Sequence, residues 1–291
     1  MLTLACLALV PTTAAQNFDD VEIQVQEVAD GIYMLLGRGG NIGVSAGEDG
    51  VFLIDDQYAP LTEKIKAAVA TVADGPIRFL LNTHWHGDHT GGNENFGEAG
   101  TLIVAHDNVR VRMSTEQINE LWDRTTPPSP EGAWPVVTFN EAVTFHMNGE
   151  EISAFHVAHA HTDGDAIVYF RNANVVHMGD TYFQAGYPFI DVDSGGSVDG
   201  LIAGVDIVLG MINEDTRVIP GHGELSNADG LRAYRDMLAT IRGRIAEHIE
   251  AGRSLEEIQA AKPSAEYDAD WGEFFIIPEQ IVQIIYTSLT R

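Results

Sequence analysis

Residues 84–89 have the sequence HWHGDH, which places four side chains able to bind metal ions within six residues. The imidazoles of His84 and His86, two positions apart, can point at one ion, and the adjacent Asp88 and His89 can turn toward a second one. Imidazole and carboxylate groups are unfavourable to bury without polar partners, so core packing does not explain this run of residues. A solvated polar turn is the simpler alternative, and the flanking segments decide between the two.

The flanking segments place the run on a loop at the end of a strand. Residues 77–83, with the sequence IRFLLNT, form a short apolar stretch typical of a buried strand. Residues 90–93, TGGN, follow with flexible glycines and helix-capping side chains. Loops at the carboxyl ends of strands commonly carry function in α/β proteins, so this setting favours a metal site over a solvated turn.

Three later segments each contain a further candidate ligand. His161 lies in AHAHTDGD, Asp180 ends VVHMGD, and His222 lies in VIPGHG. In each case the candidate follows a predicted strand or lies in a turn that contains glycine. This repetition indicates one assembled site rather than scattered histidines.

With these segments in this order, the chain resembles the metallo-β-lactamase superfamily over nearly all of its length, from about Val21 to the end. The resemblance implies a first metal ion held by three histidines, here His84, His86 and His161. It implies a second ion held by Asp88, His89 and His222. Asp180 stands at the position that bridges the two ions in some relatives and is replaced by cysteine in others.

The ligand set that the resemblance implies predicts a hydrolase with two zinc ions. Zn²⁺ suits a site rich in histidine, and two divalent ions roughly 3.5–4 Å apart can activate water and polarise a substrate carbonyl. Asp88 would bind one ion and accept a proton from the attacking water. We therefore expect hydrolysis of an activated acyl bond by a metal-bound hydroxide, with a strained cyclic amide of the β-lactam kind as the leading substrate.

Two positions leave other activities open. Cysteine-containing β-lactamases carry a thiolate where Asp180 stands and a lysine three residues later, where Phe183 stands. Aspartate at the first position is similar to the glyoxalase-II thioesterases and the lactonases, so a lactonase or thioesterase is the alternative. An iron-dependent oxidoreductase is more remote, because flavodiiron proteins carry glutamate in place of His86 and need an attached flavin domain. A non-catalytic zinc protein is a further class, against which the complete ligand set argues.

The composition limits the kinds of partner. The chain has 291 residues, of which 43 are acidic and 16 are Lys or Arg, and a formal net charge of −27. No basic face is available to neutralise phosphates, so the charge argues against a nucleic acid and favours a small-molecule substrate. The sequence predicts no oligomeric state.

Residues 1–16 have the pattern of a signal peptide. Residues 2–10 form an apolar stretch that is too short to cross a bilayer, and small residues around Ala15 offer a cleavage site. The positively charged segment that normally comes first is missing, which suggests a truncated peptide. We expect a periplasmic or secreted protein without stable membrane insertion, which loses its only cysteine, Cys6, with the peptide. Residues 17–291 are expected to form a single metallo-β-lactamase-like domain.

The rest of the pattern predicts an α/β fold. Alternating or fully apolar stretches predict strands near residues 21–28, 31–37, 41–47, 50–55, 101–105, 142–146, 151–157, 166–170 and 174–178. Helices are expected at residues 61–74, 197–209, 226–250, 254–261 and 278–288. The order of strands and then helices occurs twice, which fits an αβ/βα sandwich of two mixed sheets with outer helices, as the resemblance also implies.

The candidates for substrate contacts are Trp85, Tyr182 and Ser197. Trp85 lies inside the metal motif, and Tyr182 follows Asp180 closely. Ser197 belongs to a glycine-rich turn that opens a predicted helix, and such turns can bind anions through free backbone N–H groups. A helix cap for Ser197 and core packing for the aromatic rings are the simpler alternatives.

Further residues are expected around the metals. Residues 34–43 suit a flap, and residues 121–134, with Trp122 and Trp134, suit a rim of the pocket. Asp55 or Asp56 could orient a ligand histidine.

Overall fold

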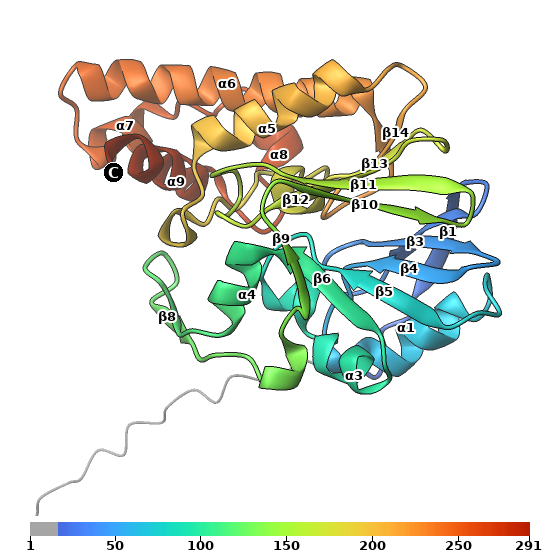
Figure 1. Cartoon of the computed structure of the whole chain (residues 1–291). Helices are drawn as coiled ribbons and strands as arrows, with labels where there is room; N and C mark the ends of the chain where they lie inside the picture. Colours follow the sequence, from blue (N-terminus) through green and yellow to red (C-terminus); the bar gives the residue numbers. More distant parts are fainter. Residues whose placement is uncertain (1–16) are drawn as a thin grey trace, which may run out of the picture.

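The computed structural model describes residues 17–291, so the expected signal peptide lies outside the described residues. Two β-sheets face each other, and helices cover the outer face of each sheet (Figure 1). The first sheet has seven strands in the order β1-β2-β3-β4-β5-β6-β9. Their bounds are Gln24–Ala29 (β1), Ile32–Leu36 (β2), Ile42–Gly47 (β3), Gly50–Ile54 (β4), Ile77–Leu81 (β5), Leu102–His106 (β6) and Val137–Phe139 (β9).

The second sheet has six strands in the order β10-β11-β12-β13-β14-β15. Their bounds are Ala142–Met147 (β10), Glu150–His156 (β11), Ala166–Phe170 (β12), Val175–His177 (β13), Arg217–Ile219 (β14) and Ser226–Asn227 (β15). Both sheets are mixed, because β4, β5, β6 and β9 pair in parallel within the first and β13 pairs in parallel with β14 within the second. The predicted αβ/βα sandwich of two mixed sheets is confirmed.

Helices lie outside both sheets (Figure 1). The first sheet is covered by α1 (Thr62–Val69) and α3 (Asn93–Glu98), and the second by α5 (Val198–Met211), α6 (Ala228–Glu250) and α9 (Pro278–Thr290). The shorter elements are α2 (Gly87–Thr90), α4 (Asp107–Met113), α7 (Leu255–Ala261), α8 (Asp268–Trp271), the hairpin of β7 (Gln117–Asn119) and β8 (Arg124–Thr126), and the 3₁₀ turns η1 (Ala59–Leu61), η2 (Glu131–Ala133), η3 (Gly179–Thr181) and η4 (Val192–Ser194). Within residues 17–291, no helix is both long and apolar enough to cross a membrane.

Apolar side chains fill the space between the sheets and beneath the helices. Phe52 and Ile54 of β4 belong to the same buried cluster as Val168 and Phe170 of β12. On the other face of β4, Leu53 belongs to the cluster that packs under α1. A strand buried on both faces needs a continuous apolar sequence, which is why all five residues of β4 are buried. This packing fixes the strands from whose ends the candidate ligands project.

Candidate metal centre

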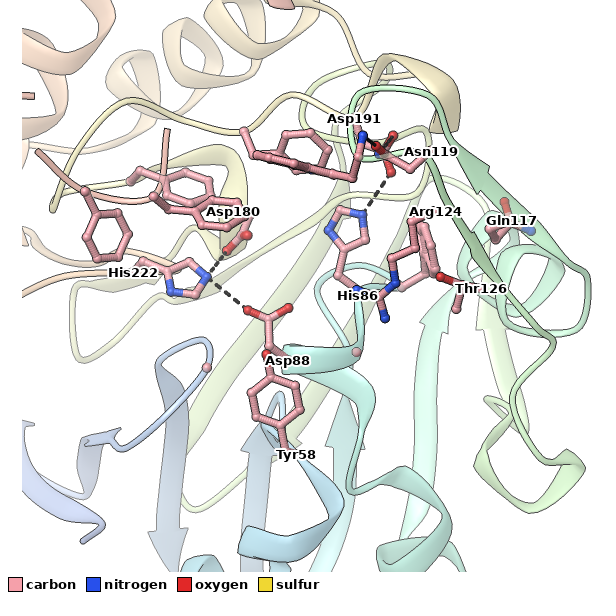
Figure 2. Close-up of a pocket in the computed structure, with 18 of the residues that line it drawn as sticks. Tyr58, His86, Asp88, Gln117, Asn119, Arg124, Thr126, Asp180, Asp191 and His222 are labelled. Atoms are coloured by element: carbon pink, nitrogen blue, oxygen red, sulfur yellow. Dashed lines mark hydrogen bonds and ion pairs between the residues drawn. The ribbon is translucent and has the colours of Figure 1, made fainter. Parts of the chain in front are cut away.

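Five regions of the chain supply the seven predicted ligands, and the structure brings all seven together. The regions are the loop after β5 (His84), α2 with its preceding residue (His86, Asp88 and His89), the loop between β11 and β12 (His161), η3 (Asp180) and the turn after β14 (His222). Figure 2 shows His86, Asp88, Asp180 and His222 converging at one pocket. Segments distant in sequence therefore form one cluster at the edge of the sandwich.

The first group of ligands consists of His84, His86 and His161. The Nδ1 atom of His86 lies 3.1 Å from Nε2 of His84 and 2.9 Å from Nε2 of His161. Three imidazole nitrogens thus face a common point, as three ligands of a tetrahedral metal site do.

The second group consists of Asp88, His89 and His222. The Oδ2 atom of Asp88 lies 3.4 Å from Nε2 of His222 and 3.7 Å from Nε2 of His89. The three donor atoms of this group lie within 4.8 Å of one another. One carboxylate and two imidazoles are a donor set that Zn²⁺ commonly accepts.

Asp180 lies between the two groups and faces both. Its Oδ1 atom is 3.1 Å from Nε2 of His89 and 3.5 Å from Nε2 of His222. Its Oδ2 atom is 3.6 Å from Nε2 of His161 and 3.8 Å from Nε2 of His84. Each oxygen therefore points at a different group, which is the arrangement of a bridging carboxylate.

Asp55 supports both groups from behind. His89 donates a hydrogen bond from Nδ1 to Oδ2 of Asp55 at 2.8 Å, and Thr83 donates to Asp55 from its backbone N and its Oγ1, each at 2.8 Å. The same Thr83 Oγ1 lies 3.1 Å from Nδ1 of His84. Partners of this kind fix the orientation of a ligand ring and leave its inward nitrogen free. The expectation that Asp55 or Asp56 orients a ligand histidine is confirmed for Asp55.

Asp191 plays the same part for His86, and the sequence analysis missed it. His86 donates from Nε2 to Oδ2 of Asp191 at 2.9 Å, so this ring presents Nδ1 to the centre. Burial opposes the ionisation of Asp191, but the hydrogen bond with His86 and the charge of that ring lower its pKa to about 2. Nearby, His161 donates from Nδ1 to the carbonyl oxygen of Phe189 at 2.7 Å. The only signal for Asp191 in the sequence is a carboxylate that directly follows an apolar stretch.

Burial and charge set the protonation of the ligand histidines. Burial lowers the pKa of His161 to about 4, and burial together with the charge of His89 lowers the pKa of His84 well below its usual value. Burial opposes the charged form of His222 too, but the carboxylates of Asp180 and Asp88 raise its pKa to about 9. The pKa of His89 is raised by the same carboxylates against the effect of burial. Histidines held beside carboxylates in this way are sites where a metal cation can replace protons.

Two buried atoms between the groups test whether the site fits a metal ion. Nε2 of His89 and Oδ1 of Asp180 are only 3.1 Å apart, yet neither atom has a hydrogen-bond partner. Buried polar atoms without partners are unfavourable and need an explanation. A cation between them satisfies both atoms, so the donor set fits a metal ion.

Gly40 and Gly221 leave the space that two of the ligands occupy. A Cβ atom on Gly40 would lie 2.1 Å from Cε1 of His89, and a Cβ on Gly221 would lie 2.1 Å from Oδ1 of Asp180. Both distances are far below van der Waals contact, so any larger residue would displace the ligand. The two backbone segments are also joined, because Asn41 donates its backbone N–H to the carbonyl oxygen of Gly221 at 2.7 Å.

The ligand groups open into a pocket of about 970 Å³ whose two sides differ in character. Near His222 the wall is aromatic, with Phe183 stacked on the histidine at a ring distance of 5.1 Å and Phe274 at 6.4 Å. Figure 2 shows Arg124 at the other side, beyond His86. Tyr58 points toward Asp88 from below (Figure 2). Aromatic rings flank both ligand groups, since Phe189 lies 5.9 Å from His86, and the side beyond His86 has a basic residue in addition.

Of the three candidates for substrate contacts, only Trp85 lines this pocket. The prediction that Tyr182 contacts the substrate is wrong. Its ring is buried against that of Tyr234 at 5.0 Å, and its hydroxyl lies 2.9 Å from Oγ of Ser226. The prediction for Ser197 is wrong as well. Its side chain caps α5 by accepting a hydrogen bond from the backbone N–H of Gly200 at 2.9 Å. The simpler alternatives of core packing and a helix cap hold for these two residues.

Some of the residues expected to form a flap (34–43) and a rim (121–134) line the pocket, and others do not. Arg38 and Gly39, in the turn between β2 and β3, line it, as does Trp122 in the β7–β8 hairpin. Trp134 lies elsewhere and donates from Nε1 to the carbonyl oxygen of Ser129 at 3.0 Å. The rim therefore consists of the hairpin, not of the whole stretch of residues 121–134.

Comparison with known proteins agrees with this geometry. The sequence profile of the Metallo-beta-lactamase superfamily matches residues 35–247, and the chain belongs to that superfamily. The chain is 29% identical to hydroxyacylglutathione hydrolase from Polaromonas sp. over 58% of this chain and 57% of that protein. It is 24% identical to 2,4-dinitroanisole O-demethylase subunit alpha from Nocardioides sp., over 57% of this chain and 46% of the relative. The chain thus spans about half the length of the curated relatives it matches.

Solved structures show the same fold. The stereoselective inverting sec-alkylsulfatase Pisa1 from Pseudomonas sp. superposes with a TM-score of 0.70 at 19% identity, over 91% of this chain and 50% of that one. A metallo-beta-lactamase from Pontibacter korlensis superposes with a TM-score of 0.62 at 17% identity, over 75% of this chain and 99% of that one. At such low identity these likenesses describe the fold alone.

Proposed function

We propose that the protein is a two-zinc hydrolase of activated acyl bonds, with a strained cyclic amide of the β-lactam kind as the first candidate substrate. The observation that carries the proposal is Asp180, whose two oxygens face two separate groups of ligands. One ion would be held by His84, His86 and His161, and the other by Asp88, His89 and His222. When bound, two zinc ions supply Lewis acidity that polarises a substrate carbonyl and lowers the pKa of water.

Asp88 is placed to accept the proton of the attacking water. Its side chain is 25% exposed at the pocket, whereas that of Asp180 is only 5% exposed. Burial favours the neutral acid, but the charges of His89 and His222 and a hydrogen bond with His222 hold the pKa of Asp88 below its ordinary value. Asp88 is therefore ionised at neutral pH, as a proton acceptor must be.

A thioester or lactone is the second candidate substrate, and Asp180 itself is the reason. The cysteine-containing β-lactamases have a thiolate at this position, and the curated relative from Polaromonas sp. is a hydroxyacylglutathione hydrolase. Glyoxalase-II enzymes use basic residues of their C-terminal part to bind glutathione, however, and the C-terminal residues that line this pocket are Glu273, Phe274 and Phe275. The C-terminal part therefore lacks the basic contacts that glutathione would need, which keeps the cyclic amide in first place.

The experiment compares kcat/KM for benzylpenicillin, a γ-lactone and an acyl thioester with zinc-loaded protein. A chelator-treated sample and the variant Asp180→Asn serve as controls, and the zinc content of each sample is measured. A chelator-sensitive value above about 10⁴ M⁻¹s⁻¹ for the penicillin supports the first candidate, since working enzymes exceed that value with their substrates. A larger value for the thioester or lactone supports the second candidate. Absence of chelator-sensitive hydrolysis of all three compounds contradicts the proposal.

A further inference from the structure

Arg124 is a basic residue at the pocket whose side chain has no partner among the described residues. Its guanidinium makes no hydrogen bond or ion pair with any of residues 17–291, although the chain has 43 acidic residues and only 16 Lys and Arg. Other exposed basic side chains do find carboxylates, as Arg235 does with Asp206 and Arg242 does with Asp199, each at 2.8 Å. The side chain of Arg253 is also unpaired among the described residues, but it lies outside the pocket, so the place of Arg124 in the pocket lining is what points to a ligand.

The hairpin that carries Arg124 is tied to the residues behind the metal ligands. The backbone N–H of Glu120 donates to Oδ2 of Asp193 at 2.7 Å, and Asn119 donates from Nδ2 to Oδ1 of Asp191 at 3.4 Å. Asp191 is the residue that orients His86. The position of Arg124 relative to the first ligand group is therefore set by hydrogen bonds, and Figure 2 shows its side chain reaching toward His86.

A second cation, Arg38, lines the same pocket from the turn between β2 and β3. The ring of Phe18 supports its guanidinium at 5.5 Å. The same turn is held against the second ligand group, because Gly40 donates its backbone N–H to the carbonyl oxygen of Asp88 at 3.1 Å. Arg38 and Arg124 are the basic residues of the pocket lining, which also contains one carboxylate outside the ligand cluster and its support, that of Glu273.

The opposite wall of the pocket offers no positive side chain. Phe183 stands where cysteine-containing β-lactamases place a lysine, and its ring stacks on His222 at 5.1 Å. Phe274 continues this wall and is 45% exposed, whereas Phe275, 55% exposed, reaches the β7–β8 hairpin, where its ring lies 5.5 Å from that of Trp122. An anionic group of a substrate would thus find the guanidinium of Arg124 beyond His86, and an apolar group would find the rings of Phe183 and Phe274 beside His222.

We propose that the substrates of this pocket carry a carboxylate, that Arg124 binds it while Arg38 adds positive charge to the pocket lining, and that the apolar part of the substrate packs on Phe183 and Phe274. The planar guanidinium of arginine can bind a carboxylate through two parallel hydrogen bonds, which gives both affinity and orientation. The inference rests on the proposed function and names the class of its substrate, an acyl compound with a free carboxylate and an apolar substituent.

The kinetic experiment compares benzylpenicillin with its methyl ester, in which the carboxylate is replaced by a neutral ester group. We expect the zinc-loaded protein to prefer the free acid, and Arg124→Ala to lower kcat/KM for the acid about tenfold, mainly through KM, without changing it for the ester. Arg253→Ala is the matched control, because Arg253 is exposed and does not line the pocket. If the ratio of kcat/KM for the acid to kcat/KM for the ester is the same in the wild type and in Arg124→Ala, the proposal is overturned.

A binding experiment separates this inference from the proposed function, because it needs no turnover. Phenylacetate and its neutral analogue phenylacetamide are titrated into the zinc-loaded protein, with the fluorescence of the pocket residues Trp85 and Trp122 as signal. A preference for phenylacetate that disappears in Arg124→Ala supports the inference even if no substrate is hydrolysed. A preference that persists unchanged in Arg124→Ala shows that the metals alone bind the carboxylate, and it overturns the inference even if the protein is a hydrolase.

Discussion

His86 illustrates how a metal-binding side chain depends on residues that are distant in the sequence. The spacing within HWHGDH singled out this histidine as a candidate ligand. Its orientation, however, depends on Asp191, which is 105 positions further along the chain. A local pattern can reveal the type of a ligand, whereas the partner that fixes its ring is decided by how the segments pack.

Replacing His86 by alanine should abolish hydrolysis and leave the fold intact. The His86 side chain contributes Nδ1 to the three-histidine group. It is 16% exposed at the pocket and is not part of the core. We expect kcat/KM to fall by at least about 10³-fold with an unchanged far-UV circular dichroism spectrum. His146→Ala, on the exposed side of β10, is the control and should retain activity. Full activity of His86→Ala would contradict the assigned site.

At the scale of elements, the long apolar patterns predicted the sandwich well. The strands β1 to β4 and the helices α5, α6, α7 and α9 lie within a few residues of their predicted ranges. The sequence analysis did not predict α4 or the β7–β8 hairpin. In α4 only Val109 and Met113 are buried, so a helix of seven residues shows too little of the helical period to be recognised. The hairpin strands have three residues each, which is too short for a detectable alternation.

The turn after β14 should tolerate no side chain at Gly221. A Cβ there would meet Oδ1 of Asp180 at 2.1 Å, so Gly221→Ala must move either the turn or the carboxylate that faces both ligand groups. We expect the zinc affinity of the variant to fall at least about tenfold, measured by competition with a chromophoric chelator. Gly243→Ala is the matched control, since nothing lies within 4 Å of a Cβ at that position of α6. Equal zinc affinity of the two variants would rule out this role of Gly221.

At the scale of the whole molecule, the ligands join the two halves of the sandwich. His84 and His89 follow β5 of the first sheet, and Asp180 and His222 follow β13 and β14 of the second sheet. Metal ions bound between them would stabilise the folded state, because the ligands are not assembled in the unfolded chain. We expect removal of zinc by a chelator to lower the Tm by on the order of 10 °C. An unchanged Tm, with zinc loss verified by elemental analysis, would show that the metals do not join the halves.

The metal-free protein should lose stability as the pH rises above neutrality. Although burial opposes it, the carboxylates of Asp180 and Asp88 raise the pKa of His222 to about 9, above its ordinary value of 6.5. A group whose pKa is higher in the folded state than in the unfolded state stabilises the folded state. This stabilisation is complete at a pH below the unfolded-state pKa and is lost as the pH rises through the folded-state pKa. The Tm of the metal-free protein should therefore fall between about pH 6.5 and pH 9, as followed by differential scanning calorimetry. The zinc-loaded protein should not show this fall, and a rise in the metal-free Tm would refute the argument.

The sequence by itself determined the class of fold and the set of candidate ligands, because both are written in local patterns of apolar residues and in short motifs. It could not determine how Asp180 faces both ligand groups, or that Asp191 supports His86. It also gave no sign of Arg124 at the pocket, and it left core packing of Tyr182 as one of two alternatives. These features arise only when the β5, β13 and β14 ends and the β7–β8 hairpin meet in space. Contacts between distant segments depend on the packing of the two sheets, which no single stretch of the chain specifies.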